Sequence, residues 1–154
     1  MSPCCLLMAP KRDYPSLPVS RVEALIHKSD TVLLLKLASE PNSGKWGLPG
    51  GVVKLGETVE EAVRREAKDQ VGLEVNLEGL LDVLDEIHHD GKGKVRFHYV
   101  LIGYLASPRR GKVVLSAEAT EYKWFTSAEV RSVFASDNTK RIVQKYLSRQ
   151  PSRA

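Results

Sequence analysis

The chain has 154 residues, the usual length of one domain, and 42% of them are hydrophobic and 27% charged. This composition is typical of a globular protein and excludes wholesale disorder. The longest apolar runs, at 32–35 and 99–105, are too short to cross a bilayer. We therefore expect one cytoplasmic domain at 19–147, with an irregular N-terminal tail at 1–18 and a flexible C-terminal tail at 148–154.

The formal net charge is +4, and much of the positive excess lies near the two ends of the chain. Charged ends are usually solvated surface, so nucleic acid is not an expected partner, although the charge suits a small anionic substrate. The start of the chain lacks the pattern of a secretory signal. Cys4 and Cys5 are the only cysteines, and adjacent cysteines do not easily bridge each other. A reduced tail is preferred here over a lipidated anchor.

The first part of the chain predicts a β-hairpin. Arg21–His27 and Thr31–Leu37 are apolar runs separated by a short polar turn. A loop at Pro41–Gly44 follows, then a short strand at Trp46–Leu48 and a turn at Pro49–Gly51.

From residue 58 the apolar period becomes that of a helix. Thr58 and Glu61 have the spacing of a capping box, and Gly72 is a natural helix stop. These boundaries predict a helix over Val59–Val71.

The second half predicts a long hairpin followed by shorter elements. Leu80–His88 and Lys94–Leu105 have the pattern of two strands joined by a glycine-rich turn. Two short extended pieces follow, at Val113–Leu115 and Tyr122–Phe125. A short helix is expected after a cap formed by Thr126 and Glu129, and a last helix at Thr139–Leu147. This mixed order favours an α/β sandwich over a doubly wound parallel sheet.

The helix at 59–71 carries carboxylates where a structural helix would carry apolar groups. Its apolar stripe consists of Val59, Ala62, Val63 and Ala67. Glu66 and Gln70 fall inside this stripe, and Asp69 lies beside it. An unpaired ionised carboxylate in an apolar setting is costly or shifts its pKa. Glu66 therefore needs a positive partner, which is Arg65, another basic group or a metal ion.

The spacing of these polar residues suits a metal. Positions 66, 69 and 70 are i, i+3 and i+4, so their side chains converge, and Glu57 reaches the same end of the helix. Mg²⁺ and Mn²⁺ prefer clustered oxygen ligands of this kind. A solvated acidic face is the alternative, but it does not explain a glutamate among the apolar positions.

The same segment resembles the Nudix signature G-x5-E-x7-R-E-U-x-E-E-x-G-U, in which U is aliphatic. The residues that fit its frame are Gly51, Glu57, Arg65, Glu66, Gly72 and Leu73, with Ala67 at the first U. Such a spacing is specific as motifs go. The resemblance departs at the paired glutamates, which are Asp69 and Gln70 here. An amide oxygen carries no charge, so weaker metal binding is expected.

The resemblance implies a fold and an activity. The fold would be a Nudix-type α/β/α sandwich with a mixed β-sheet, running from about Val19 to Leu147. The activity would be that of a pyrophosphohydrolase, in which water attacks a phosphorus of a diphosphate linkage. Mg²⁺ or Mn²⁺ would neutralise the phosphate charge and activate that water.

The resemblance also assigns roles at the helix. Glu66 and Asp69 are the first expected metal ligands, and the carbonyl of Gly50 and the side chain of Gln70 are weaker ones. Arg65 is expected to orient Glu57 or Glu66 rather than to touch substrate. Glu57 remains open as an outer ligand or as a structural partner of Arg65.

Family members often carry a further acid in a later loop. Glu118, which precedes Trp124, resembles that residue and would serve as a general base or an extra ligand. Glu121 is its rival, and a solvated loop acid is the alternative for either. Glu66, Glu118 and Arg65 are thus the expected catalytic set.

Substrate contacts are expected at three positions. Lys36 ends a strand and would meet phosphate, unless it is simply exposed. Trp46 would stack on a base or pack in the core. Gly51 lies in the turn next to the expected metal.

The expected substrate is a small nucleotide. Known subfamily marks downstream of the motif are absent, which leaves nucleoside diphosphate sugars, ADP-ribose included, and nucleoside triphosphates, with the sugars preferred. The alternative is a catalytically weakened domain that binds nucleotides or regulates, and Gln70 keeps this reading open. An RNA-cap hydrolase would need a basic groove that the sequence does not show. Homodimers are common among such proteins, and the sequence leaves the oligomeric state open.

Overall fold

The structure is a computed structural model that describes residues 11–149. The expected roles of the paired cysteines and of the outermost tails lie outside this range. None of the helices in the described range is long and apolar enough to cross a membrane.

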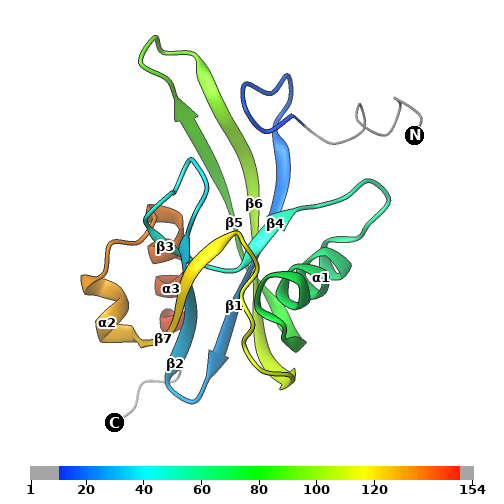
Figure 1. The fold of residues 1–154 in the computed structure, drawn as a ribbon, viewed down its shortest axis with the longest axis vertical. Helices are drawn as coiled ribbons and strands as arrows, with labels where there is room; N and C mark the ends of the chain where they lie inside the picture. The colour runs from blue at the N-terminus through cyan, green and yellow to red at the C-terminus, as the bar shows by residue number, and fades with distance from the viewer. Residues whose placement is uncertain (1–10, 150–154) are drawn as a thin grey trace.

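A mixed β-sheet forms the centre of the molecule (Figure 1). Its strands are β1 (Val19–Lys28), β2 (Thr31–Leu37), β3 (Trp46–Gly47), β4 (Gly50–Val52), β5 (Glu74–His89), β6 (Val95–Arg110) and β7 (Ala119–Thr126). Their order is β3-β2-β1-β6-β5, with β4 also paired to β1 and β7 to β2. Only the β1–β6 pair is parallel among the described strands. Strand β1 therefore joins two groups of strands.

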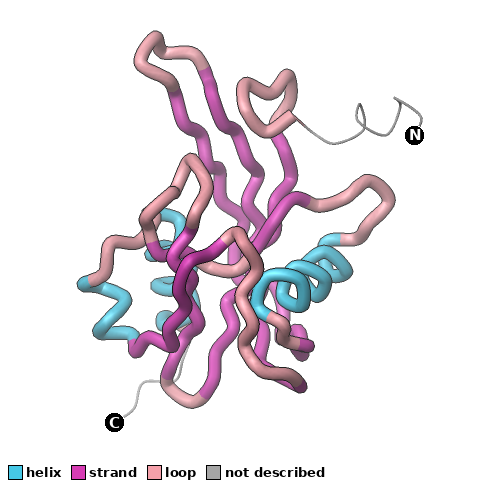
Figure 2. Tube along the Cα trace, viewed as in Figure 1, coloured by secondary structure: helices cyan, strands magenta, loops and turns pink. Residues whose placement is uncertain are grey.

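Helices cover both faces of this sheet. They are α1 (Val59–Val71), α2 (Ser127–Ser132) and α3 (Asp137–Ser148). Helix α1 lies on one side of the strands, and α2 and α3 lie on the other (Figures 1 and 2). The expected α/β/α sandwich with a mixed sheet is thereby confirmed.

Local sequence determines the boundaries of α1. The Thr58 hydroxyl accepts from the backbone N–H of Glu61, whose carboxylate accepts from the N–H of Thr58. At the other end Gly72 adopts a left-handed conformation, with φ of 71°, which glycine adopts without strain. The helix spans the expected residues.

Two of the three hydrophobic clusters in the described part of the chain lie between the sheet and its helices. The apolar stripe of α1 packs on the face of β1 that carries Val22, Ala24 and Ile26. On the opposite face, α3 packs its residues Ile142 and Val143 against a second cluster. Because side chains alternate along a strand, β1 contributes to both cores.

The β5–β6 hairpin is longer than its sequence pattern indicates. Strand β5 begins at Glu74 rather than Leu80, and β6 continues to Arg110 rather than Leu105. Pairing shifts register around Gly79, as β-bulges do, and this interrupts the alternation on which the expectation depended.

Two other expectations were wrong. Of the segment Pro49–Gly51, expected as a turn, Gly50 and Gly51 are instead extended, because Gly50–Val52 pairs with β1 as strand β4. The segment Val113–Leu115 is not a strand. Instead, the Val114 N–H donates to the carbonyl of Val71 at 3.0 Å, which ties this segment to the end of α1.

Gly50→Ala tests the β1–β4 pairing. A Cβ at Gly50 would overlap the carbonyl oxygen of Val22 and lie 3.0 Å from the Cα of Glu23. Overpacking against backbone should lower the free energy of unfolding by about 2 kcal/mol or more. The control is Gly91→Ala, where a Cβ meets nothing within 4 Å. Chemical denaturation of both variants checks this, and equal stability would contradict the observed pairing.

Candidate active site

A cleft of about 410 Å³ opens beside the start of β4 and the middle of α1. One wall comes from β1 and the segment from β4 onward, and the other from the end of β2 and the loop after it. The residues that line the cleft at its α1 end are Gly50, Gly51, Arg65, Glu66, Gln70 and Glu118. Its volume is that of a small-molecule site.

Arg65 binds two carboxylates and one backbone carbonyl. Its Nε and Nη2 donate to the two carboxylate oxygens of Glu57, at 2.6 and 2.9 Å. Nη1 donates to Glu66 at 2.5 Å, and Nη2 also donates to the carbonyl of Val52 at 3.1 Å. All three side chains are at most 21% exposed. The guanidinium is thus the positive partner that the position of Glu66 requires.

This arrangement shifts the pKa values of the pair. The hydrogen bonds from Arg65 lower the pKa of Glu57 to about 2, although burial opposes the shift. The same bonds raise the pKa of Arg65. Both groups are therefore charged at neutral pH. Of the two roles left open for Glu57, the geometry shows the contact with Arg65.

Gln70 connects the helix to β4 and to the loop before β7. Its Nε2 donates to the carbonyl of Gly50, to Glu66 Oε2 at 3.0 Å and to Glu118 Oε2 at 2.7 Å. In return, the Gly50 N–H donates to Gln70 Oε1 at 3.1 Å. An amide nitrogen carries two hydrogens, so three oxygens share two donors. These oxygens converge on one point.

The converging oxygens suit a hard divalent cation. Two are carboxylate oxygens, from Glu66 and Glu118, and the third is the Gly50 carbonyl oxygen, so they come from three separate segments. Mg²⁺ and Mn²⁺ take oxygens of this type. Across residues 11–149, no three His, Cys, Asp or Glu side chains gather at one point. A cation here would therefore need oxygen ligands other than carboxylates, and the Gly50 carbonyl is one that lies at this point.

Gly51 leaves room for the carboxylate of Glu66. A Cβ at this position would lie within 2.7 Å of the carboxylate atoms of Glu66. Any side chain would displace Glu66 from the cleft. The glycine of the motif thus serves close approach between strand and helix.

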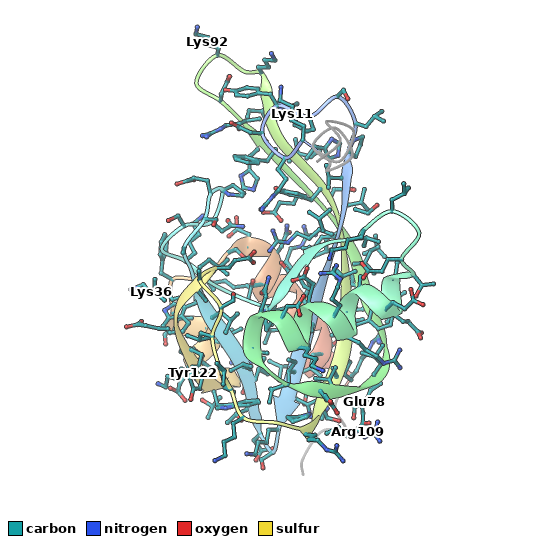
Figure 3. The ribbon with its side chains drawn as sticks, turned by 45° about the vertical axis from the view of Figure 1, so that its right-hand side comes forward. Lys11, Lys36, Glu78, Lys92, Arg109 and Tyr122 are labelled. Atoms are coloured by element: carbon teal, nitrogen blue, oxygen red, sulfur yellow. The ribbon has the colours of Figure 1, made fainter. Side chains whose placement is uncertain are left out.

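Three expected site residues lie elsewhere. Asp69 is 62% exposed and outside the cleft lining, with its carboxylate 3.9 Å from Arg65. Lys36 points outward beside β7, where its Nζ lies 3.9 Å from a carboxylate oxygen of Glu121 (Figure 3). Trp46 is partly buried and packs edge-on against Phe125 at 5.0 Å between ring centroids, at the margin of the second core cluster.

The same contacts separate the two candidate acids of the late loop. Glu118 reaches Gln70 and lines the cleft, whereas Glu121 is directed to the outer surface with Lys36. The Ser116 N–H donates to the carbonyl of Gln70 at 3.0 Å, which holds the loop against α1.

Sequence reasoning missed the polar residues of β1. Arg21 lines the cleft, and Glu23 lies on the same face of the strand beside Gly50. Burial raises the pKa of Glu23 to about 8, with Arg21 opposing the shift and Glu86 adding to it. The signal that indicates them is two charged residues at alternate positions of a strand that is otherwise largely apolar.

Comparison with known proteins identifies the family. The solved MutT NUDIX hydrolase of Burkholderia pseudomallei superposes with a TM-score of 0.70 at 30% identity, covering 84% of this chain and 98% of that one. The fold is therefore that of a Nudix hydrolase. The family model for the NUDIX domain matches residues 18–146, so the chain belongs to the NUDIX family.

Two curated relatives carry different substrate names. The ADP-ribose pyrophosphatase of Methanocaldococcus jannaschii is 35% identical over 108 residues, 70% of this chain and 62% of that protein. The nucleoside triphosphatase NudI of Escherichia coli O139:H28 is 31% identical over 108 residues, 65% of this chain and 76% of that protein. The match thus spans less than two thirds of the archaeal relative.

Glu57→Gln tests the clamp in which Arg65 binds Glu57 and Glu66 together. Because the folded-state pKa of Glu57 lies near 2, below its ordinary value of 4.5, the ionised group stabilises the fold above about pH 4.5. That stabilisation is lost as the pH falls toward 2. The variant should lose about 1 to 2 kcal/mol of unfolding free energy at pH 7, and the deficit should shrink as the pH falls through this window.

The control for this measurement is Glu60→Gln, at an exposed position in the first turn of the same helix. It should change stability by only a few tenths of a kcal/mol, about what a charge near a helix end contributes. Urea titrations at pH 7, 4 and 2.5 provide the comparison. A deficit for Glu57→Gln that does not vary with pH would contradict an ionised Glu57 in the clamp.

Proposed function

We propose that this chain is a metal-dependent pyrophosphohydrolase that cleaves the diphosphate linkage of a nucleotide. The observation that carries the proposal is the convergence of Glu66 Oε2, Glu118 Oε2 and the Gly50 carbonyl at one end of the cleft. Membership of the NUDIX family supports the reaction class. The bound cation would be Mg²⁺ or Mn²⁺, and it would neutralise phosphate charge and activate water.

Residues of α1 and β4 have the following proposed roles. Glu66 and Gly50 present oxygens to the cation, with Gln70 able to contribute its amide oxygen after rotation. Arg65 holds the Glu66 carboxylate in place through a 2.5 Å hydrogen bond. Asp69, at the exposed rim, contributes charge rather than a buried ligand. These roles use no residue outside α1 and β4.

Glu118 is the proposed base. It comes from a loop rather than from the helix, and its Oε2 lies within hydrogen-bond distance of the amide that marks the convergence point. A carboxylate at that place can accept a proton from the attacking water. The contact that this oxygen makes is with the amide of Gln70 rather than with the guanidinium of Arg65.

The preferred substrate class is a nucleoside diphosphate sugar, ADP-ribose included, with nucleoside triphosphates second. The name of the archaeal relative supports the first class and that of the bacterial relative supports the second. A Nudix domain that only binds nucleotides is the alternative, and one observation favours it. The amide of Gln70 already occupies the point where the oxygens converge.

The test is a hydrolysis screen with Glu66→Gln beside the wild type. Nucleotide sugars, dinucleotides and triphosphates are incubated with Mg²⁺ and with Mn²⁺, and phosphate products are quantified. The wild type should hydrolyse one class, and Glu66→Gln should reduce turnover by orders of magnitude while remaining folded. Glu121→Gln, on the outer surface, is the matched carboxylate control and should keep wild-type turnover. Full turnover in Glu66→Gln would refute the metal assignment.

Gln70→Glu separates the enzyme from the binding module. The variant removes the donor shared by Glu66 and Glu118 and places three carboxylates together, so the metal-free protein should melt at a lower temperature. Added Mn²⁺ should stabilise the variant more than the wild type and bind roughly tenfold more tightly or better. Calorimetric titration and melting with and without Mn²⁺ measure both effects.

Two results would overturn parts of this assignment. Unchanged Mn²⁺ affinity in Gln70→Glu would show that position 70 does not face the ion. A wild type that is inert on every substrate, together with an active Gln70→Glu, would make the natural protein a binding module.

A further inference from the structure

A second polar site lies on β1, away from the oxygens that converge on Gln70. Within residues 11–149, the buried side-chain nitrogen and oxygen atoms without a hydrogen-bond partner are Arg21 Nε and Glu23 Oε2. Buried polar groups are nearly always paired, so two unpaired atoms so close in the chain require an explanation. One is a donor and the other is a carboxyl oxygen.

The two residues share one face of the strand, and Arg21 borders the cleft. They are two positions apart on β1, so their side chains lie on the same side of the sheet. Arg21 lines the cleft, and its cross-strand neighbour is Val52, another lining residue. Glu23 is opposite Gly50, which lines the cleft as well.

The Tyr99 ring contacts Arg21, but within residues 11–149 neither Arg21 Nε nor Glu23 Oε2 has a hydrogen-bond partner. The guanidinium of Arg21 lies over the ring of Tyr99, with 5.6 Å between its carbon and the ring centroid. Glu86, the other buried carboxylate nearby, accepts from Asn42 at 2.9 Å and contacts His88 Nε2 at 3.0 Å. Glu86 is thus provided with partners, whereas the Oε2 of Glu23 is not. Held donors and acceptors without partners are pre-organised for a ligand.

We propose that Arg21 and Glu23 form a subsite for the nucleobase of the nucleotide, binding its hydrogen-bonding edge. A planar base presents an acceptor beside an N–H donor on one edge. Arg21 Nε–H can donate to that acceptor, and Glu23 Oε2 can accept from that N–H. Because this inference rests on the proposed nucleotide ligand, it names a part of that ligand and not a second reaction.

The arrangement also gives the substrate a direction. Strand β4 lies between the α1 end of the cleft and the residues Arg21 and Glu23 of β1. Its residue Gly50 forms hydrogen bonds with Gln70 and lies against Glu23. A nucleotide in the cleft would place its phosphates toward α1 and its base toward β1. Ligands that lack a base would lose the β1 contacts only.

The experiment measures binding and needs no turnover. Affinities of AMP, GMP, CMP, UMP and ribose 5-phosphate are determined by calorimetry without metal, for the wild type, Arg21→Met and Glu23→Met. The wild type should bind at least one of the four nucleotides about tenfold or more tightly than ribose 5-phosphate, the discrimination of a good two-point contact. Both variants should bring that ratio close to one while leaving ribose 5-phosphate affinity unchanged.

Two further variants control for charge and for folding. Arg64→Met removes an exposed arginine on α1 outside the cleft lining and should keep the wild-type ratio. Glu23→Gln keeps the side-chain shape and one acceptor oxygen, so it should retain part of the discrimination. Thermal melting shows whether each variant is folded.

The outcomes separate this subsite from the hydrolytic proposal. Three results would overturn the base subsite: a wild-type affinity ratio near one for all four nucleotides, no binding at all, or a ratio that both methionine variants preserve. In the third case ordered water would be the partner of Arg21 Nε and Glu23 Oε2. Base-dependent binding that the variants remove supports the subsite, even if the metal-dependent screen detects no hydrolysis. In that case only the proposed reaction fails.

Discussion

The contact between Arg65 and its two carboxylates is the constraint on which the rest of the site depends. Glu57 and Glu66 are both largely buried, and the Arg65 guanidinium forms an ion pair with each of them. The guanidinium binds both and also the carbonyl of Val52, so it fixes helix α1, the loop before it and strand β4 at once. Because breaking such a buried pair leaves an uncompensated charge, this geometry is expected to persist while ligands enter and leave. Arg65 therefore holds the acidic end of the cleft in place through contacts within the protein itself.

Gln70 imposes a second constraint, which favours the metal-free site over a metal-bound one. Its amide lets Glu66 and Glu118 approach one point without a cation, which stabilises the metal-free site. The same oxygens are the ones a divalent ion would use, so ion and amide compete for them. A glutamate at this position would repel its neighbours in the empty site but attract the ion more strongly. If the proposed metal site is correct, this single position would set the balance between metal-free stability and metal affinity.

The parts of the molecule that sequence reasoning predicted are those with local causes. The boundaries of α1 follow from Thr58, Glu61 and Gly72, all within or next to the helix. The pairing of Gly50–Val52 with β1 could not be predicted, because two glycines and a preceding proline have the local pattern of a turn and only the distant strand makes them extended. Long-range packing also decides which expected residues reach the cleft, as Trp46 shows by packing in the core. The site roles themselves stay predictions.

The position of Gly50 explains why this short strand matters more than its length indicates. On one side its N–H and C=O are bound by the Gln70 side chain, and on the other the atoms of Glu23 and Val22 leave no room for a Cβ. The backbone of β4 at Gly50 therefore contacts both the acidic end of the cleft and the polar face of β1. A shift of strand β4 would move both the Gly50 carbonyl, proposed as a cation ligand, and the backbone beside Glu23, proposed to contact a nucleobase. Geometry at the two ends is coupled through one residue without a side chain, and this coupling requires glycine there.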